Sequence, residues 1–411
     1  MGRSTTWMVV LTLWANAVNY ASSVVFSRLL SPAAYGDLTA LFALSVIASV
    51  PAVAAQTVIG DRLATLAAQG KDDEARLLIR HAAGRIGTIA AVAGLAYLAC
   101  VPLVERGLHL GAVGPALALA PLLALTFVLP LANGFLLGYD RFVALGLVAL
   151  AVAASRLVIG VPWILAGGGA GAPLLGQAIG YVAVIVAIAW FMRARIAGPG
   201  TRALRSGLRR RIGPAAVAAS VAFVLFALVQ NLDLLLAKLV LSSTEGGLYA
   251  ALTTAGKIVF FLPGAVSAVM VPSAARARLT QGSGDAVLRV AGGLVLATTL
   301  VVALPMALEP HLVLDTMFGS EYTGVSAGVL PIVWANGALA LLYLVVIYTV
   351  AVGDRRWVLV LAGGLTAQCG AFAAFHSSPT EIATVQAILV TAMLITNELL
   401  FQPIFLRRAG R

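Results

Sequence analysis

The sequence has few charged residues. Asp, Glu, Lys and Arg make up only 10% of its 411 residues, whereas 61% are hydrophobic and the mean hydropathy is +1.00. A typical soluble domain has about 25% charged and about 45–50% apolar residues. This shortage of charge excludes an ordinary soluble globular protein and indicates a chain that crosses a membrane many times.

Residues suited to redox or metal chemistry are also scarce. The two cysteines, Cys100 and Cys369, lie inside apolar runs, so we interpret them as small buried hydrophobic residues rather than as a disulfide. The four histidines are dispersed over predicted loops and form no metal-binding set. The sequence therefore predicts no metal and no cofactor; the histidines are His81, His109, His311 and His376.

Long apolar runs are abundant instead. A bilayer core of about 30 Å requires about 20 apolar residues per helix, and helices are the spanning structure for long runs without alternation. We predict an all-α polytopic membrane protein with about twelve transmembrane helices. The predicted spans are residues 7–27, 38–59, 86–104, 115–137, 142–165, 173–192, 214–237, 247–270, 287–307, 324–351, 357–375 and 383–405.

The basic residues predict how these spans are oriented. Most of the 27 Lys and Arg residues fall on one side when the N-terminus is placed inside, and cytoplasmic loops favour basic residues. Both termini are thus predicted to be cytoplasmic, and the alanine-, arginine- and glycine-rich composition indicates a bacterial cytoplasmic membrane. The net charge of +11 then reflects topology and contact with anionic lipids rather than nucleic-acid binding. We expect the segment Phe318–Tyr322 of the longest outer loop to lie at the membrane interface.

Two stretches separated by about half the chain resemble one another. Arg28–Ala40 reads RLLSPAAYGDLTA and Lys238–Ala250 reads KLVLSSTEGGLYA, so a basic residue, two aliphatic residues and a glycine recur in step. Gly138–Phe142 and Gly353–Trp357 form another such pair at nearly the same offset. Similar pairs at a nearly constant offset predict two copies of one structural unit.

We therefore predict two lobes of six helices each. The lobes are residues 1–195 and 213–411, joined by an arginine-rich cytoplasmic linker at residues 196–212. Because each copy has an even number of spans, both copies have the same orientation, and a pseudo-twofold axis along the membrane normal is expected to relate them.

Several motifs resemble those of a known family. Ser27–Gly36 is similar to the first-loop signature of bacterial polysaccharide-biosynthesis flippases, within the multidrug/oligosaccharidyl-lipid/polysaccharide exporter superfamily. Asn231–Asp233, Val271–Pro272 and Phe318–Tyr322 are similar to patterns at the same relative positions in that family, and the resemblance covers nearly the whole chain.

The resemblance implies a two-lobed bundle that alternates between inward-open and outward-open states. Such a protein moves a polyprenyl-diphosphate-linked oligosaccharide from the inner to the outer leaflet for cell-surface polysaccharide biosynthesis. We expect a monomer, with a polysaccharide polymerase or another assembly protein as its candidate protein partner.

Charged residues at membrane depth are functional candidates by default, because burying them is costly. Arg156 and Lys257 lie within predicted spans, and Arg28 and Lys238 lie at the predicted outer rim. We interpret these four as a cationic cavity that binds a diphosphate. In the alternative interpretation, Arg156 and Lys257 pair with carboxylates between the lobes, and Arg28 and Lys238 reach the lipid headgroups.

Carboxylates and amides in the predicted spans complete the candidate site. Asp233 and Glu398 either carry a coupling H⁺ or Na⁺ ion or serve as salt-bridge partners. Polar side chains in the first and seventh spans are expected to line the cavity, although each alone is also typical of a hydrogen bond between helices. These residues are Asn16, Asn19 and Asn231.

Two other classes of function stay open. A cation-coupled multidrug exporter of the same superfamily should place a carboxylate in the membrane part of the N-terminal half, where the predicted spans contain only Arg156. A membrane enzyme would need positioned acids or bases on a sizeable outer surface, and the predicted outer loops are short, so we predict no enzyme. A scaffold of envelope-polysaccharide assembly is the last alternative, and buried Arg156 and Lys257 argue against it.

Overall fold

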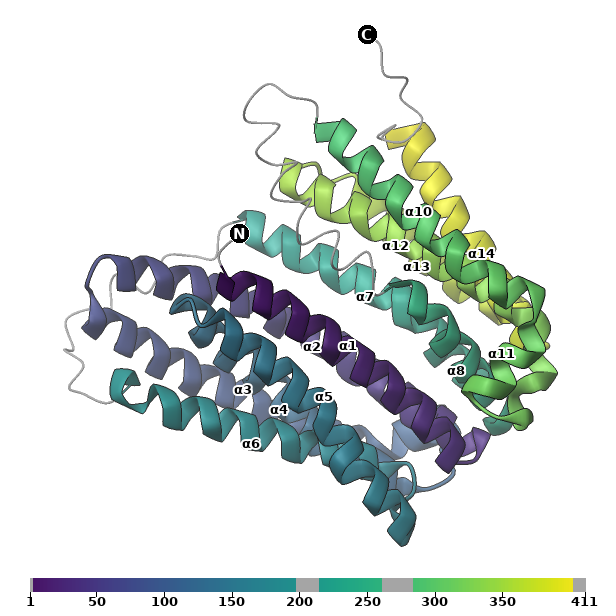
Figure 1. The fold of residues 1–411 in the computed structure, drawn as a ribbon, viewed down its shortest axis with the longest axis horizontal. Helices are drawn as coiled ribbons and strands as arrows, with labels where there is room; N and C mark the ends of the chain where they lie inside the picture. Colours follow the sequence, from purple (N-terminus) through teal and green to yellow (C-terminus); the bar gives the residue numbers. More distant parts are fainter. Residues whose placement is uncertain (1–2, 197–213, 261–283, 402–411) are drawn as a thin grey trace. The chain divides into compact units, whose positions relative to one another are not determined.

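The chain folds into helices throughout the part that the structure describes. The computed structural model describes residues 3–196, 214–260 and 284–401, and every regular element in these ranges is helical (Figure 1). Eleven of the helical segments are long and apolar enough to cross a membrane. The predicted all-α polytopic fold is thereby confirmed. The predicted eighth span is described only as far as Phe260, and residues 197–212 of the predicted linker and Val271–Pro272 lie outside the described residues.

Contacts divide the chain into two compact units. Unit 1 comprises residues 1–22 and 44–220, and unit 2 comprises residues 23–43 and 221–411. The first two helices, α1 (Arg3–Leu29) and α2 (Pro32–Ala68), therefore each begin or end in unit 2 while the rest of each helix belongs to unit 1. The predicted boundary at residues 196–212 stays a prediction. The structure also assigns the turn between α1 and α2 to unit 2, which the sequence did not indicate.

In unit 1, the central helix is α4. It packs against the helices that precede and follow it in the chain and against α6. Its span is more than half buried, which distinguishes it from the other helices of this unit. Besides α1 and α2, the helices of unit 1 are α3 (Asp72–Gly107), α4 (Val113–Gly138), α5 (Phe142–Trp163) and α6 (Gly171–Ile196), with a π-helical turn η1 (Ile164–Gly168) after α5.

Helices α2 and α3 are longer than the predicted spans 38–59 and 86–104. With 37 residues, α2 is about 55 Å long at 1.5 Å per residue, which exceeds a bilayer core of about 30 Å. The predicted loop between them is thus helical except for a tight turn, in which Gly70 has a φ of 68°. Buried residues of α2 and α3, including Leu63 and Ile79, pack against Leu131 and Phe135 of α4 and stabilise this extension.

Unit 2 is arranged around α12 (Val329–Val352), which packs against α8, α10 and α14. Its span is two-thirds buried, because neighbouring helices surround it. The other helices of unit 2 are α7 (Pro214–Val240), α8 (Ser243–Lys257), α10 (Gly284–Leu308), α11 (Pro310–Met317), α13 (Trp357–Ala374) and α14 (Pro379–Thr396), with short turns η3 (Ile258–Phe260), η4 (Ser320–Gly328) and η5 (Asn397–Phe401).

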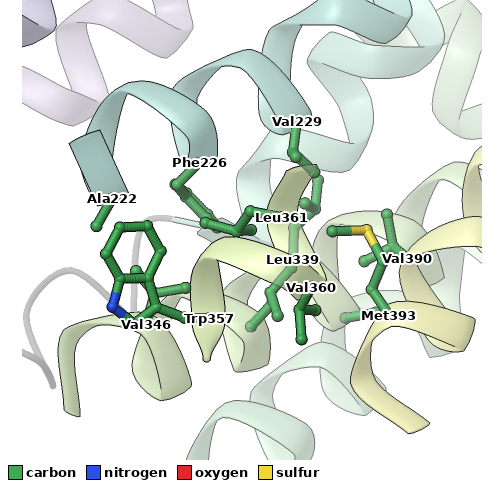
Figure 2. Close-up of a cluster of buried hydrophobic side chains, with 12 residues drawn as sticks. Ala222, Phe226, Val229, Leu339, Val346, Trp357, Val360, Leu361, Val390 and Met393 are labelled. Atoms are coloured by element: carbon green, nitrogen blue, oxygen red, sulfur yellow. The ribbon is translucent and has the colours of Figure 1, made fainter. Parts of the chain in front are cut away.

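The core of unit 2 joins α7, α12, α13 and α14. Figure 2 shows Phe226 of α7 beside Trp357 and Leu361 of α13, with Met393 of α14 at the other end of the cluster. The Met393 side chain fits because residue 364 is glycine: a Cβ there would lie 2.3 Å from the Met393 methyl carbon. Close packing of this kind gives the four helices one arrangement rather than several.

The predicted repeat agrees with the positions of the helices. The turn between α1 and α2 and the turn between α7 and α8 each comprise two residues, Leu30–Ser31 and Leu241–Ser242. Helices α5 and α13 begin at Phe142 and Trp357, which are the matched final residues of the second repeated pair. The central helices α4 and α12 are therefore the equivalent fourth spans of the two copies.

The segment Phe318–Tyr322 is part of the packing of unit 2, and its position at the membrane interface stays a prediction. The predicted loop folds into α11 and η4, and both aromatic residues are fully buried. Tyr322 packs edge-on against Tyr35, with ring centroids 6.2 Å apart, and its hydroxyl donates to the carbonyl oxygen of Ser27 at 3.2 Å. The segment is thus a packing element of unit 2, because its aromatic rings cover the α1–α2 turn.

Helices α2 and α8 cross at a pair of glycines from the two repeats. A Cβ on Gly36 would lie 2.8 Å from the Cα atom of Gly247, and a Cβ on Gly247 would lie 1.8 Å from the carbonyl oxygen of Pro32. Both distances are shorter than any normal contact, so only glycine permits this approach. The two stretches whose similarity reveals the repeat therefore contact one another directly.

Gly247→Ala should destabilise unit 2. The added methyl group clashes with backbone atoms, which cannot rotate away as a side chain can, so we expect a loss of at least about 1–3 kcal/mol. The matched control is Gly363→Ala in α13, where a Cβ meets nothing within 4 Å. The control should leave thermal unfolding in detergent unchanged or slightly raised, and equal midpoints for both variants would contradict the close crossing.

Candidate functional site

A buried ion pair lies beside this crossing. Lys238 Nζ lies 2.8 Å from Asp37 Oδ1, and the relative exposures of the two residues are 0% and 4%. Lys238 Nζ also donates to the carbonyl oxygen of Ser243 at 3.3 Å. The cation therefore does not reach lipid headgroups, and that alternative interpretation of Lys238 is wrong.

Asp37 lies in a helix rather than in a loop. The predicted second span begins one residue after it, but α2 begins at Pro32, so Asp37 lies inside this helix and is buried. An unpaired charge in this environment would be strongly unfavourable. Because Asp37 contacts Lys238, each residue provides the counterion that makes the burial of the other tolerable.

Each of the two repeated stretches contributes a buried tyrosine, although at a different position within the stretch. Tyr35 and Tyr249 are both fully buried. The hydroxyl of Tyr35 lies 3.0 Å from Thr254 Oγ1, and the hydroxyl of Tyr249 donates to Asp233 Oδ2 at 2.9 Å. Each phenol thus finds a polar partner within unit 2, as buried tyrosines require.

Asp233 is a buried carboxylate with unused capacity. Its exposure is 5%, and among the described residues Oδ1 accepts no hydrogen bond. Lys257 attracts it electrostatically but forms no direct ion pair with it in the described part of the chain. Lys257 is the last residue of α8, and the 3₁₀ turn η3 follows it directly.

Arg28 has a different role from the one predicted. Its side chain is exposed, and it donates to the carbonyl oxygens of Met317 at 3.3 Å and Asp315 at 3.2 Å, and to that of Thr316. These carbonyls are at the C-terminus of α11, where a cation interacts favourably with the helix dipole. Arg28 therefore fixes α11 against the α1–α2 turn.

The remaining predicted residues are dispersed. Asn231 is buried, and its amide donates to the carbonyl oxygen of Ala227 in its own helix at 2.9 Å. Asn16 and Asn19 lie half-buried on the part of α1 that belongs to unit 1. Glu398 is buried in the π-helical turn η5 of unit 2.

Arg156 of unit 1 begins a chain of hydrogen bonds that includes two residues absent from the predicted site. Its Nε donates to Gln177 Oε1 at 2.6 Å, and Gln177 Nε2 donates to the Tyr181 hydroxyl at 2.9 Å. Gln177 is buried, whereas Arg156 and Tyr181 are half-buried. The chain of hydrogen bonds joins α5 to α6 within the predicted membrane region.

Small residues bring α5 and α6 close enough for this chain. A Cβ on Gly180 would lie 2.0 Å from Ser155 Oγ, and a Cβ on Gly176 would lie 3.1 Å from the backbone nitrogen of Gly160. The spacing Gly176–Gly180 is the small-xxx-small pattern of packed membrane helices. This spacing, with a glutamine directly after its first glycine, is the signal that could have identified Gln177.

A groove lies elsewhere on unit 2. It has a volume of about 550 Å³, runs between α12 and α14, and is lined almost wholly by apolar side chains. A hydrogen bond from Trp334 Nε1 to Thr391 Oγ1 at 3.0 Å joins its two helices. None of the predicted site residues lines this groove, so it does not correspond to the predicted cationic cavity.

Comparisons with known proteins agree with the fold. No family model matches the sequence, and no curated protein matches it. A multidrug resistance MATE family transporter of the MOP superfamily, in an inward-facing conformation, is 12% identical with a TM-score of 0.72, over 96% of this chain and 95% of that one. The lipid II flippase MurJ, in an inward closed conformation, is 13% identical with a TM-score of 0.70, over 97% and 89%.

A further structure, a mutant of the MATE transporter VcmN from Vibrio cholerae, is 15% identical with a TM-score of 0.62, over 98% of this chain and 97% of that one. At these identities the likeness shows the fold alone. The chain has, over nearly its entire length, a fold found in transporters and in a lipid flippase.

Breaking the buried ion pair should destabilise the protein. Asp37→Ala leaves Lys238 without its carboxylate, so we expect a loss of about 3–5 kcal/mol. The double variant Asp37→Leu with Lys238→Met should recover most of that loss, because apolar residues of similar volume replace both charges. Thermal unfolding of the purified protein measures both effects.

The matched control is Lys71→Met, which removes an exposed pair with Glu74 at 3.8 Å. A surface pair of this kind contributes about 0–1 kcal/mol. A double variant less stable than Asp37→Ala would contradict the pairing.

Proposed function

We propose that the protein is a flippase for a lipid-linked oligosaccharide. It moves a polyprenyl-diphosphate-linked oligosaccharide from the inner to the outer leaflet of a bacterial cytoplasmic membrane by alternating access, for cell-surface polysaccharide biosynthesis. The fold, shared along nearly the whole chain with transporters and a lipid flippase, supports a transport function of this general kind.

The observation that carries the proposal is the environment of Arg156. This arginine lies within a helix that is long and apolar enough to span a membrane, and its Nε donates to the neutral amide of Gln177. Helices α4, α5 and α6, which pack against one another, contain no Asp or Glu. A guanidinium in such surroundings is suited to a phosphate group, which it can bind through two parallel hydrogen bonds.

We propose a cationic site of fewer residues than the sequence predicts. Lys238 contacts Asp37, and Arg28 contacts the end of α11, so both have structural roles. Lys257 and Arg156 stay as proposed diphosphate ligands, with Asn16, Asn19 and Asn231 as proposed lining residues. The two cations are proposed because of their charge, and the asparagines because of their polar side chains and their location in predicted spans.

A cation-coupled multidrug exporter is the second candidate, and Asp233 is the observation that favours it. A buried carboxylate that retains an unused oxygen can bind H⁺ or Na⁺. The same residue also suits a flippase driven by an ion gradient. We propose Asp233, with Glu398 as a second candidate, as the coupling site in either case.

We also propose a cellular location and partners for the protein. Both termini are placed in the cytoplasm, basic loops contact anionic lipids, and the protein acts as a monomer without enzymatic activity or cofactor. A polysaccharide polymerase or another assembly protein is the proposed protein partner, because it would consume the transported lipid-linked unit.

Deletion of the gene should cause an oligosaccharide-lipid to accumulate. Mass spectrometry of polyprenyl-diphosphate-linked glycans measures this in the deletion strain and after complementation. Wild type should clear the lipid, whereas Arg156→Ala should not, because the guanidinium is lost. The control is Arg141→Ala. It removes an exposed arginine that directly precedes α5 and lies over the ring of Phe191 in α6, and the variant should clear the lipid as wild type does. Unchanged lipids with increased sensitivity to cationic compounds would favour the drug exporter.

Asp233→Asn should uncouple transport from the ion gradient. Asparagine keeps an oxygen for the Tyr249 hydroxyl but cannot gain a charge, so substrate binding should persist while gradient-driven transport falls at least tenfold. Transport in proteoliposomes with imposed H⁺ or Na⁺ gradients measures this. The control Asp315→Asn changes an exposed carboxylate on α11 and should have no effect. Full gradient dependence in Asp233→Asn would exclude this residue as the coupling site.

A further inference from the structure

We propose that the apolar groove between α12 and α14 holds the polyprenyl chain of the transported lipid. This inference rests on the proposed function and deepens it, because it assigns a place to the hydrocarbon part of the substrate. The groove is lined by Leu330, Pro331 and Trp334 of α12 and by a face of α14 that extends from Thr384 to Ile395.

The groove runs along two helices that can cross a membrane. Both belong to segments that are long and apolar enough to do so, Ser320–Val350 and Pro379–Leu400. From Thr384 to Ile395, α14 rises by about 17 Å at 1.5 Å per residue, which is about half of a bilayer core of about 30 Å. The medium around the groove is therefore hydrocarbon rather than water.

The polar side chains along the groove are already paired. Trp334 Nε1 donates to Thr391 Oγ1 at 3.0 Å, and Thr391 Oγ1 donates to the carbonyl oxygen of Ala387 at 2.7 Å. Thr384 Oγ1 donates to the carbonyl oxygen of Thr380 at 2.9 Å. The described residues that line the groove thus offer neither a charge nor an unused N–H or O–H donor to a head group, and the groove suits a hydrocarbon chain.

Contacts between α12 and α14 fix the width of the groove. The Trp334–Thr391 hydrogen bond joins the two helices, and a Cβ on Gly328, directly before α12, would lie 3.4 Å from the Cα atom of Thr380. Farther along, both helices contribute to the buried core of unit 2. Lipid tails are as apolar as leucine, so binding here must come from close packing. Walls that are already fixed supply such packing without being ordered on binding.

The shape of the groove favours a branched chain over a straight one. On α14, the lining residues Ile388, Ala392 and Ile395 follow one another at the spacing of one helical turn, so they form a row along the helix. The alanine leaves a notch between the two larger side chains. A polyprenyl chain carries a methyl branch on each of its units, which can fill this notch, whereas an unbranched acyl chain leaves it empty and forfeits dispersion contacts.

The size of the groove suits a segment of such a chain. Its volume of about 550 Å³ lies within the range of about 300–1,000 Å³ that is typical of small-molecule sites. The remainder of a long polyprenyl chain would then stay among the lipid tails.

Trp334 is a natural fluorescent probe of the groove, because it lines it and is 43% exposed. The purified full-length protein is placed in vesicles of phosphatidylcholine with brominated acyl chains, which quench a tryptophan that they touch. The protein has six tryptophans, so the emission of Trp334 is taken as the difference between wild type and Trp334→Phe. We expect undecaprenol to reduce the quenching of Trp334 at least twofold. Oleyl alcohol, which is unbranched, should leave it unchanged at the same total number of chain carbons.

Ala392→Leu fills the notch and tests the fit directly. The matched control is Ala367→Leu in α13, which adds the same atoms outside the groove. Both alanines are exposed, so both variants should fold. We expect the undecaprenol concentration that gives half of the protection to rise at least fivefold in Ala392→Leu and to stay at the wild-type value in Ala367→Leu.

The outcomes separate this inference from the flippase proposal, because undecaprenol lacks both the diphosphate and the oligosaccharide. Quenching of Trp334 that undecaprenol leaves unchanged would show that ordinary acyl chains cover the groove, and it would overturn the inference while the flippase proposal stands. Equal protection by both alcohols, or equal shifts in the two leucine variants, would overturn it as well. If Ala392→Leu fails to fold, the comparison of the two alcohols on wild type decides. Selective protection of Trp334 without accumulation of an oligosaccharide-lipid in the deletion strain would support the groove and overturn the flippase proposal.

Discussion

The ion pair between Asp37 and Lys238 is the constraint on which the packing of unit 2 depends. Neither charge can be buried alone, so the two residues must lie together. The glycines make this possible: a Cβ on Gly246 would lie 2.9 Å from Lys238 Cδ, and Gly36 and Gly247 allow the backbones of α2 and α8 to touch. Helix approach and charge neutralisation therefore depend on each other, because separation of the helices would leave two buried charges uncompensated.

The two repeats supply unequal chemistry to this contact. The first copy has Gly36 followed by Asp37, whereas the second has Gly246 followed by Gly247. The extra glycine admits the backbone of the first copy, and the acidic residue meets the lysine of the second. A pair of identical copies would place like residues opposite one another. The difference between Asp37 and the matched Gly247 therefore makes the two similar stretches complementary to one another.

The sequence was sufficient to predict the class of fold and the repeat, because hydrophobic length and recurring motifs are local properties. It did not predict the helical extensions of α2 and α3, since residues 60–85 are too polar to be read as spans and are stabilised by contacts with Leu131 and Phe135. Asp37 was placed in a loop, because only tertiary structure shows that it contacts Lys238. Gln177 was missed since a single amide in an apolar helix is usually a packing contact.

The cations of the predicted site differ in whether a carboxylate lies near them. Lys238 has Asp37 beside it, and Lys257 is attracted by Asp233, so both cations have a carboxylate in the same unit. Helices α4, α5 and α6 contain no Asp or Glu, and Arg156 donates from Nε to the neutral amide of Gln177. This difference in surroundings is the reason for preferring Arg156 as the proposed ligand of an anionic group, because a cation that already faces a carboxylate has less attraction left for another anion.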